Sequence, residues 1–192
     1  MKAYLTVIAF LVCCAHGLIA QNNAELKELQ TEDLAAQENK QVQRTDEDRA
    51  KRVLELLAKG MAQTPEDKYN AAIVLQHTPA DECEGRIISK GIYNYLLAHY
   101  LAREAYASGF QPARILVAQS IDRYMSMTEG RQKYGTNRFI NQKTGKEELA
   151  PIDRSTPDSE RAKYGVPPLA ELLKQWPEQK IKSKSPQKKP GK

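Results

Sequence analysis

The side chains best suited to chemistry in this chain are His77, His99, Cys83 and Asp122. Histidine exchanges protons near neutral pH, and a cysteine thiolate is a nucleophile. Cys83 follows His77 by six residues, but catalysis by such a pair depends on its distance in space. A hydrolase that uses His77 and Asp122, with or without Cys83, is one hypothesis that these residue types support.

Asp122 is the most informative of these residues because it lies at the edge of an apolar helix face. The residues three and four positions away, which share its face, are Ala118, Gln119, Met125 and Ser126. A buried carboxylate needs a partner, and Arg123 points about 100° away on the same helix. We therefore expect Asp122 to pin the loop 132–137 onto the helices. The expected donors are backbone N–H groups and the hydroxyls of Tyr134 and Thr136.

The alternative is that the same region binds a ligand in a pocket. The residues expected to line this pocket are Asp122, Arg123, Gln132, Tyr134 and Thr136, with His77 contributed from another helix. His77 lies at a helix C-terminus, where the carbonyl groups favour a protonated imidazole, so a capping role competes with a binding role. His99 shares a helix face with apolar residues and is expected to be a core residue.

The sequence carries no stronger catalytic or cofactor signature. It contains no Walker loop, no dinucleotide-binding glycine fingerprint, no metal-binding histidine pair at helical spacing and, after residue 20, no cysteine pair. We therefore predict neither a cofactor nor a metal. The preferred hypothesis is a non-enzymatic protein that binds a protein or a small ligand. A purely structural envelope protein is a further alternative.

Residues 1–20 predict export. Lys2 is followed by an apolar run at 3–12 and by small residues up to Ala20, which is the pattern of a secretory signal peptide. Cleavage is expected after Ala20, and cleavage after Gly17 is the alternative. The run is shorter than the roughly 20 apolar residues of a membrane-spanning helix, so no transmembrane span is expected. The expected location is secreted or periplasmic. Cleavage leaves Cys83 as the single cysteine, which excludes an intrachain disulfide.

The positive charge is concentrated at the C-terminus. The chain has 29 basic and 24 acidic residues, and six of the lysines fall within 179–192, which leaves 23 basic residues elsewhere. A specific nucleic-acid-binding domain would instead cluster basic residues on a folded face. We predict a disordered, lysine-rich tail at 178–192 that is solvated and has no function of its own, and the alternative is a weak attraction to an anionic surface.

Helical periodicity dominates between these ends. Residues 21–44 are polar and poor in large apolar side chains, so we predict a linker there that carries at most a fraying helix. Residues 45–177 form the predicted domain, with capping-box helix starts at Thr45 and Thr64. Apolar side chains recur every three or four positions in four segments, 46–60, 64–76, 89–108 and 112–128.

Short connections make consecutive helices antiparallel. The expected fold is therefore mainly α, a compact bundle of helix hairpins similar to tetratricopeptide repeats. A change of period after Gly130 predicts a small β-hairpin near 134–152 with a glycine-containing turn. An acidic loop is expected at 80–85. Shorter helices are predicted to start at Thr156 and Pro167.

From about Thr64 to Trp176 the chain also resembles a family of bacterial proteins. The segments that carry the resemblance are Leu75–His77, Leu97–His99, Leu101–Ala102, AQSIDRY at 118–124, RQKYGTN at 131–137 and YGVPPLAELL at 164–173. The family pattern has glycine at the position of Thr78 and glutamine at that of Asn137. The family is classed only as a domain of unknown function. The resemblance therefore implies a helical fold, sometimes compared with tetratricopeptide-like proteins, and no established activity.

Overall fold

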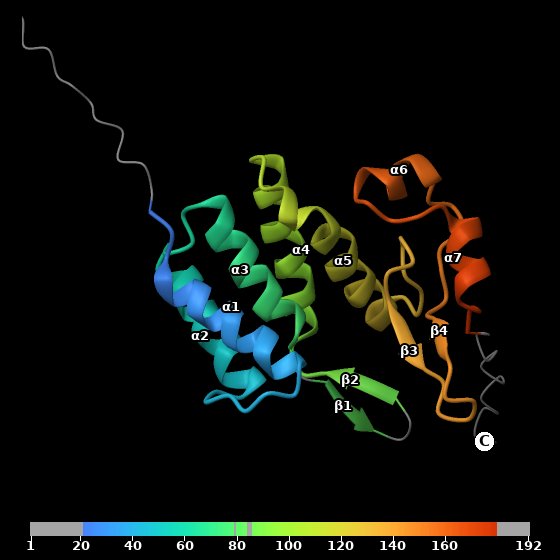
Figure 1. Cartoon of the computed structure of the whole chain (residues 1–192), viewed down its shortest axis with the longest axis horizontal. Helices are drawn as coiled ribbons and strands as arrows, with labels where there is room; N and C mark the ends of the chain where they lie inside the picture. Colours follow the sequence, from blue (N-terminus) through green and yellow to red (C-terminus); the bar gives the residue numbers. More distant parts are fainter. Residues whose placement is uncertain (1–20, 79, 84–85, 180–192) are drawn as a thin grey trace, which may run out of the picture.

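The computed structural model of this chain describes residues 21–78, 80–83 and 86–179. The predicted signal peptide at 1–20 and residues 180–192 of the predicted tail lie outside the described residues. The described part is mainly helical, with two small antiparallel sheets of two strands each (Figure 1). The expected fold class is confirmed.

Two helices begin where the capping boxes predict. Helix α2 (Asp46–Ala58) has Thr45 as its N-cap, and helix α3 (Pro65–Gln76) has Thr64. The Thr45 hydroxyl accepts a hydrogen bond from the Asp48 backbone at 3.1 Å, and the Thr64 hydroxyl accepts one from the Asp67 backbone at 3.0 Å. Each aspartate accepts in return from the backbone N–H of its threonine, so the box is complete at both helices.

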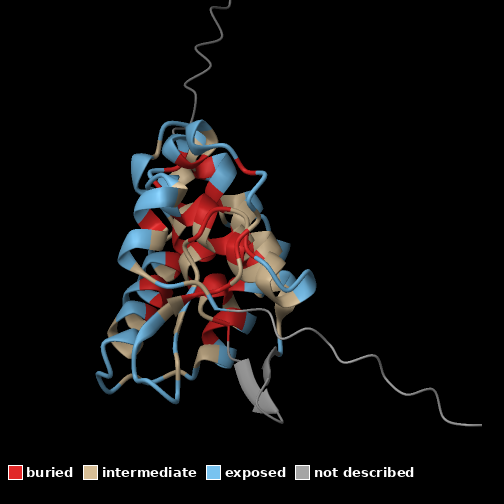
Figure 2. Ribbon diagram, turned by 90° about the vertical axis from the view of Figure 1, so that its right-hand side faces the viewer, coloured by how far each residue is buried: buried red, intermediate tan, exposed pale blue. Residues whose placement is uncertain are grey.

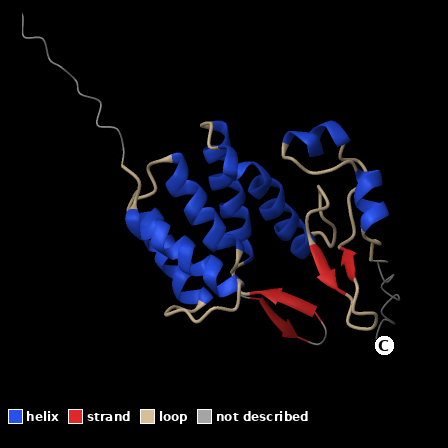
Figure 3. Cartoon of the chain, in the orientation of Figure 1, coloured by secondary structure: helices blue, strands red, loops and turns tan. Residues whose placement is uncertain are grey.

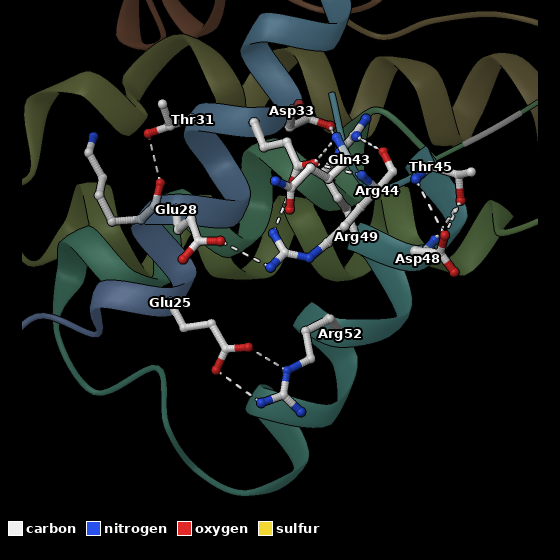
Figure 4. A network of polar contacts seen from close by, with 12 residues as sticks. Glu25, Glu28, Thr31, Asp33, Gln43, Arg44, Thr45, Asp48, Arg49 and Arg52 are labelled. Carbon is white, nitrogen blue, oxygen red and sulfur yellow. Dashed lines mark hydrogen bonds and ion pairs between the residues drawn. The ribbon is translucent and has the colours of Figure 1, made fainter. Parts of the chain in front are cut away.

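Helix α1 (Ala24–Gln37) corrects the interpretation of residues 21–44 as a polar linker. Leu26 and Leu29 are fully buried and belong to the main core. Two large apolar side chains are enough here because α2 and α3 cover them. The polar face of α1 is used as well, since Glu25 forms an ion pair with Arg52 of α2 at 2.6 Å (Figure 4). The helix therefore depends on tertiary contacts that its own composition does not reveal.

Helices α3, α4 (Ile92–Ala107) and α5 (Arg114–Thr128) lie side by side as the centre of the bundle (Figure 1). A short 3₁₀ helix, Gln111–Ala113, leads into α5. The helices approach closely because fully buried alanines lie between them, which are Ala71, Ala72, Ala98, Ala102 and Ala118. Figure 2 shows these buried segments through the middle of the molecule and exposed residues on its outer turns.

Both sheets are hairpins (Figure 3). Strands β3 (Arg138–Ile140) and β4 (Glu147–Leu149) form the predicted hairpin, with Phe139 opposite Glu148. Strands β1 (Ala80–Cys83) and β2 (Arg86–Ser89) form a second hairpin where we expected an acidic loop. Strands of four residues are too short for an alternating pattern to stand out beside a long helix.

The C-terminal part packs against the α5 side of the bundle. Helix α6 (Asp158–Lys163) and helix α7 (Leu169–Gln175) follow the predicted starts near Thr156 and Pro167. Leu172 of α7 is buried in the main core. Among the described residues, no helix is both long and apolar enough to cross a membrane.

Candidate functional site

The Asp122 carboxylate of α5 holds the loop after that helix. Oδ1 accepts hydrogen bonds from the backbone N–H groups of Lys133 at 2.8 Å and Tyr134 at 2.7 Å. Oδ2 accepts from the backbone N–H groups of Gly135 at 2.9 Å and Thr136 at 2.8 Å, and from the Thr136 hydroxyl at 2.8 Å. Asp122 is fully buried. The expectation that it pins this loop onto the helices is confirmed.

This coordination explains how a charge is kept inside the fold. Burial raises the pKa of the Asp122 carboxyl, and the loop donors oppose that rise because they stabilise the charged form. The Tyr134 hydroxyl, one of the expected donors, instead donates to Glu160 at 3.0 Å. Burial raises the pKa of Tyr134 well above its ordinary value, so this hydroxyl remains a donor.

Arg161 of α6 holds the same loop from its carbonyl side. Its side chain is almost completely buried. Nε donates to the Tyr134 carbonyl at 3.1 Å, and the two terminal nitrogens reach the carbonyls of Thr156 at 2.5 Å, Asp153 at 3.4 Å and Lys133 at 3.5 Å. We call Asp122, Arg161 and residues 133–136 the loop clamp. One carboxylate takes the N–H groups of the loop, and one guanidinium takes its carbonyl groups.

The side-chain amide of Gln132 also holds this loop, through hydrogen bonds to backbone groups. Its Nε2 donates to the carbonyls of Asn137 at 2.9 Å and Ala150 at 2.8 Å, and its Oε1 accepts from the Asn137 N–H at 2.7 Å. The amide therefore bridges the loop and the strand β4 region. Asp122, Gln132 and Tyr134 are buried and engaged with their own chain, so they serve the fold at this position.

His77 lies in a second polar cluster, at the C-terminal end of α3. It is the C-cap residue of that helix, and its Nδ1 lies 2.5 Å from Oδ2 of Asp33 in α1. The other oxygen of Asp33 lies 3.4 Å from Nε of Arg49, whose side chain is fully buried. Figure 4 shows Asp33 beside Arg49, where α1 meets α2. The Asp33 carboxylate thus joins three helices.

Arg123 reaches this second cluster and not the loop clamp. Its guanidinium donates to the Gln76 carbonyl at 2.7 Å, which caps the end of α3. Burial lowers the pKa of the Arg123 guanidinium, and the nearby charge of Asp33 opposes that effect. The expectation that Arg123 is no partner for Asp122 is therefore confirmed. Of the six predicted ligand residues, His77 lies at the end of α3, the Arg123 side chain reaches that end from α5, and the others lie in or beside the clamped loop.

The chemistry available to His77 follows from these contacts. An imidazole held at Nδ1 by a carboxylate has its Nε2 oriented as a proton acceptor. The His77 side chain is 16% exposed, and no hydrogen bond joins its Nε2 to a nucleophile among the side chains that the structure describes. The side chain of Cys83 lies outside that set. Asp122 has both oxygens occupied, so the partner of His77 is Asp33.

The described part of the chain contains no group of three or more histidine, cysteine, aspartate or glutamate side chains arranged to hold a metal ion. Its carboxylates in the two clusters are instead occupied by arginine, histidine and backbone donors.

His99 is hydrogen-bonded within the bundle, although it is only partly buried and does not belong to the core. It lies on α4, and its Nδ1 donates to the Val117 carbonyl of α5 at 2.9 Å. Burial lowers the pKa of the His99 imidazole below its ordinary value of 6.5. The unfolded chain therefore binds this proton more readily than the folded chain. The stability that neutral His99 contributes is present above pH 6.5 and is lost as the pH falls below it.

The variant His99→Asn tests this assignment, because Asn places a non-titrating N–H donor close to the position of Nδ1. We expect the wild type to lose more unfolding free energy than the variant between about pH 8 and about pH 5. Urea denaturation at a series of pH values measures the difference, and all other titratable groups are the same in the two proteins. Parallel pH profiles for the two proteins would contradict the assignment.

A groove of about 460 Å³ runs along the exposed side of α2. Its α2 wall contains apolar side chains spaced one turn apart, which are Ala50, Leu54 and Ala58, and charged ones, which are Glu47, Lys51 and Glu55. The opposite wall comes from the start of α4 and the chain before it. There the Asn94 amide donates to the Thr78 hydroxyl at 2.9 Å, which holds that wall together. None of the six predicted ligand residues lines this groove.

No family model, curated protein or solved structure matches this chain. Sequence reasoning missed two central residues, Asp33 and Arg161. Asp33 shares a helix face with Leu29 and Leu26, which precede it by four and seven positions, so predicting α1 would have exposed it. Arg161 lies on a helix of six residues, too short for a periodic signal.

Proposed function

We propose that this chain is an exported, non-enzymatic interaction protein that holds a helix of a partner polypeptide in the α2 groove. The observation that carries the proposal is the groove itself, in which Leu54 and Ala58 are exposed beside the buried Ala50. Leu54 is 38% exposed there. Export rests on the signal-peptide pattern of residues 1–20, and the family resemblance agrees with a helical protein without an assigned reaction.

A helix is the occupant that fits this groove. Ala50, Leu54 and Ala58 follow one another at intervals of four residues, which is the row that packs against a second helix. The row spans about three turns, a length typical of an amphipathic helix laid into a groove. Charged side chains border the row, so the partner needs an apolar seam flanked by charges of complementary sign.

The two polar clusters favour binding over catalysis. The buried carboxylates of Asp33 and Asp122 are used to join helices and to hold a loop. A catalytic acid or base must instead face a reacting group within hydrogen-bond reach. The open surface of the described chain is therefore better suited to recognition than to proton transfer.

Site-specific photo-cross-linking tests the proposal. A photoreactive phenylalanine analogue at Leu54, in protein expressed in its native host, is expected to give a covalent product. Mass spectrometry should place the linked residue on the apolar face of a helix. The matched control carries the analogue at Ile140 of β3, which is 58% exposed and far along the chain from the groove. Failure of the folded Leu54 variant to form a product, or an equal product from the Ile140 variant, would reject the groove as the binding site.

A further inference from the structure

The charges beside the groove alternate in sign along α2. Glu47, Lys51, Glu55 and the C-cap residue Lys59 follow at intervals of four residues, so they form one row on the helix surface. We call these four residues the α2 charge row. Within its own chain, Glu55 also pairs with Arg52 at 2.8 Å. Glu47, Lys51 and Glu55 line the groove, beside the apolar side chains of Ala50, Leu54 and Ala58.

This row is complementary to itself in one orientation. Along the chain the charges of the row run negative, positive, negative, positive. Read in the opposite direction, they run positive, negative, positive, negative. Two α2 helices that cross antiparallel therefore set Glu47 opposite Lys59 of the second copy and Lys51 opposite Glu55 of the second copy. A parallel arrangement sets like charges against one another, which is unfavourable.

The apolar seam obeys the same symmetry. Leu54 lies midway between Ala50 and Ala58, so a twofold axis at Leu54 brings the two leucines together. Each exposed Ala58 then lies over Ala50 of the second copy, which is small and buried, so the two helix backbones can approach closely. The charge row is centred at position 53 and the apolar row at position 54, about 1.5 Å apart along the helix, so one antiparallel alignment brings both rows close to their partners, as an isologous contact requires.

We propose that the helix held in the α2 groove is α2 of a second copy of this chain. The inference deepens the proposed function, because it names the partner of the same groove. Alternating charges on a helix usually belong to a solvated face. The exposed Leu54 and the groove beside the row distinguish α2 from such a face.

Charge reversal provides the test, by sedimentation equilibrium of the purified chain. The wild type is expected to dimerise, and the dissociation constant is expected to fall at low salt. Lys51→Glu and Glu55→Lys each replace two attractive pairs with two repulsive ones. Each is therefore expected to raise the dissociation constant by about tenfold or more.

An equimolar mixture of Lys51→Glu and Glu55→Lys chains is expected to form a heterodimer, because every contact between positions 51 and 55 is again attractive. The double variant Lys51→Glu/Glu55→Lys is expected to dimerise like the wild type. Lys146→Glu, an exposed reversal on the turn between β3 and β4, is the control that leaves the dimer unchanged. Circular dichroism verifies that each variant is folded.

The outcomes separate this inference from the proposed function. A wild type that remains monomeric, or single variants that dimerise as well as the wild type, overturns the second copy as the partner. A monomeric wild type whose Leu54 variant still cross-links to a helix of another protein leaves the groove function intact. A Leu54 product with twice the mass of the chain supports both.

Discussion

Asp122→Ala is expected to lower the free energy of unfolding by about 4 kcal/mol. The carboxylate accepts the backbone N–H groups of residues 133–136 and the Thr136 hydroxyl, in the interior of the protein. Without it, these donors lose their acceptor where water does not replace it fully. Each unsatisfied buried donor costs about 1–3 kcal/mol, although partial relaxation of the loop reduces the sum.

The measurement is equilibrium urea denaturation followed by circular dichroism, with a thermal melt as a second readout. A loss of this size corresponds to roughly 8–16 °C in melting temperature for a domain of this length. Glu129→Ala, which removes an exposed carboxylate at the C-terminal end of the same helix, is the matched control and is expected to change stability by at most about 0.5 kcal/mol. A loss below about 1 kcal/mol for Asp122→Ala would show that the loop does not depend on the carboxylate.

Arg161→Lys is expected to lower the free energy of unfolding by about 3 kcal/mol even though the charge is kept. The planar guanidinium donates to several carbonyls at once, those of Tyr134 and Thr156 at 3.1 and 2.5 Å. A lysine ammonium is a single point of charge and cannot reach carbonyls in such different directions. At least two buried carbonyl groups would lose their donor.

Urea denaturation also measures this change, and Lys163→Arg, at an exposed position of the same helix, is the matched control. The variant Asp122→Ala/Arg161→Lys adds a sharper test, because both residues hold residues 133–136. The double variant is expected to lose less unfolding free energy than the sum of the losses of the two single variants, by about 1 kcal/mol or more. If the two losses were strictly additive, the two residues would act independently, and that result would contradict the loop clamp.

Local signals in the sequence located most of the helices. Thr45 and Thr64 marked the starts of α2 and α3, because a capping box satisfies the free N–H groups of a helix end through contacts within four residues. Gly109, with a φ of 92°, terminates α4 where the periodicity ends. These features depend on neighbours in the chain, so they can be recognised without knowing the fold.

The role of Asp122 in holding the loop could also be predicted from the residues near it in the sequence. A carboxylate three and four positions from apolar residues must be buried, and a buried charge must be bonded. The identity of the bonded loop followed from its closeness in the chain. The opposing residue, Arg161, was not accessible, because it meets Lys133 and Tyr134 only after α6 folds back over the loop.

Helix α1 shows the limit of composition. Residues 21–44 have few large apolar side chains, and only the covering surfaces of α2 and α3 make Leu26 and Leu29 sufficient. The same packing created the pair between Asp33 and His77, whose residues lie 44 positions apart in the chain. It also redirected His77 away from Asp122, which the sequence had placed with it.

The sequence by itself determined a mainly helical chain, the ends of its central helices and the need of Asp122 for a nearby partner, because each of these depends on periodicity and on contacts within a few residues. Only the tertiary structure decided which residues meet. It paired Asp33 with His77, set Arg161 across the loop from Asp122 and left the groove of α2 open. Packing between distant segments selects such contacts, and no short stretch of the chain contains both sides of them.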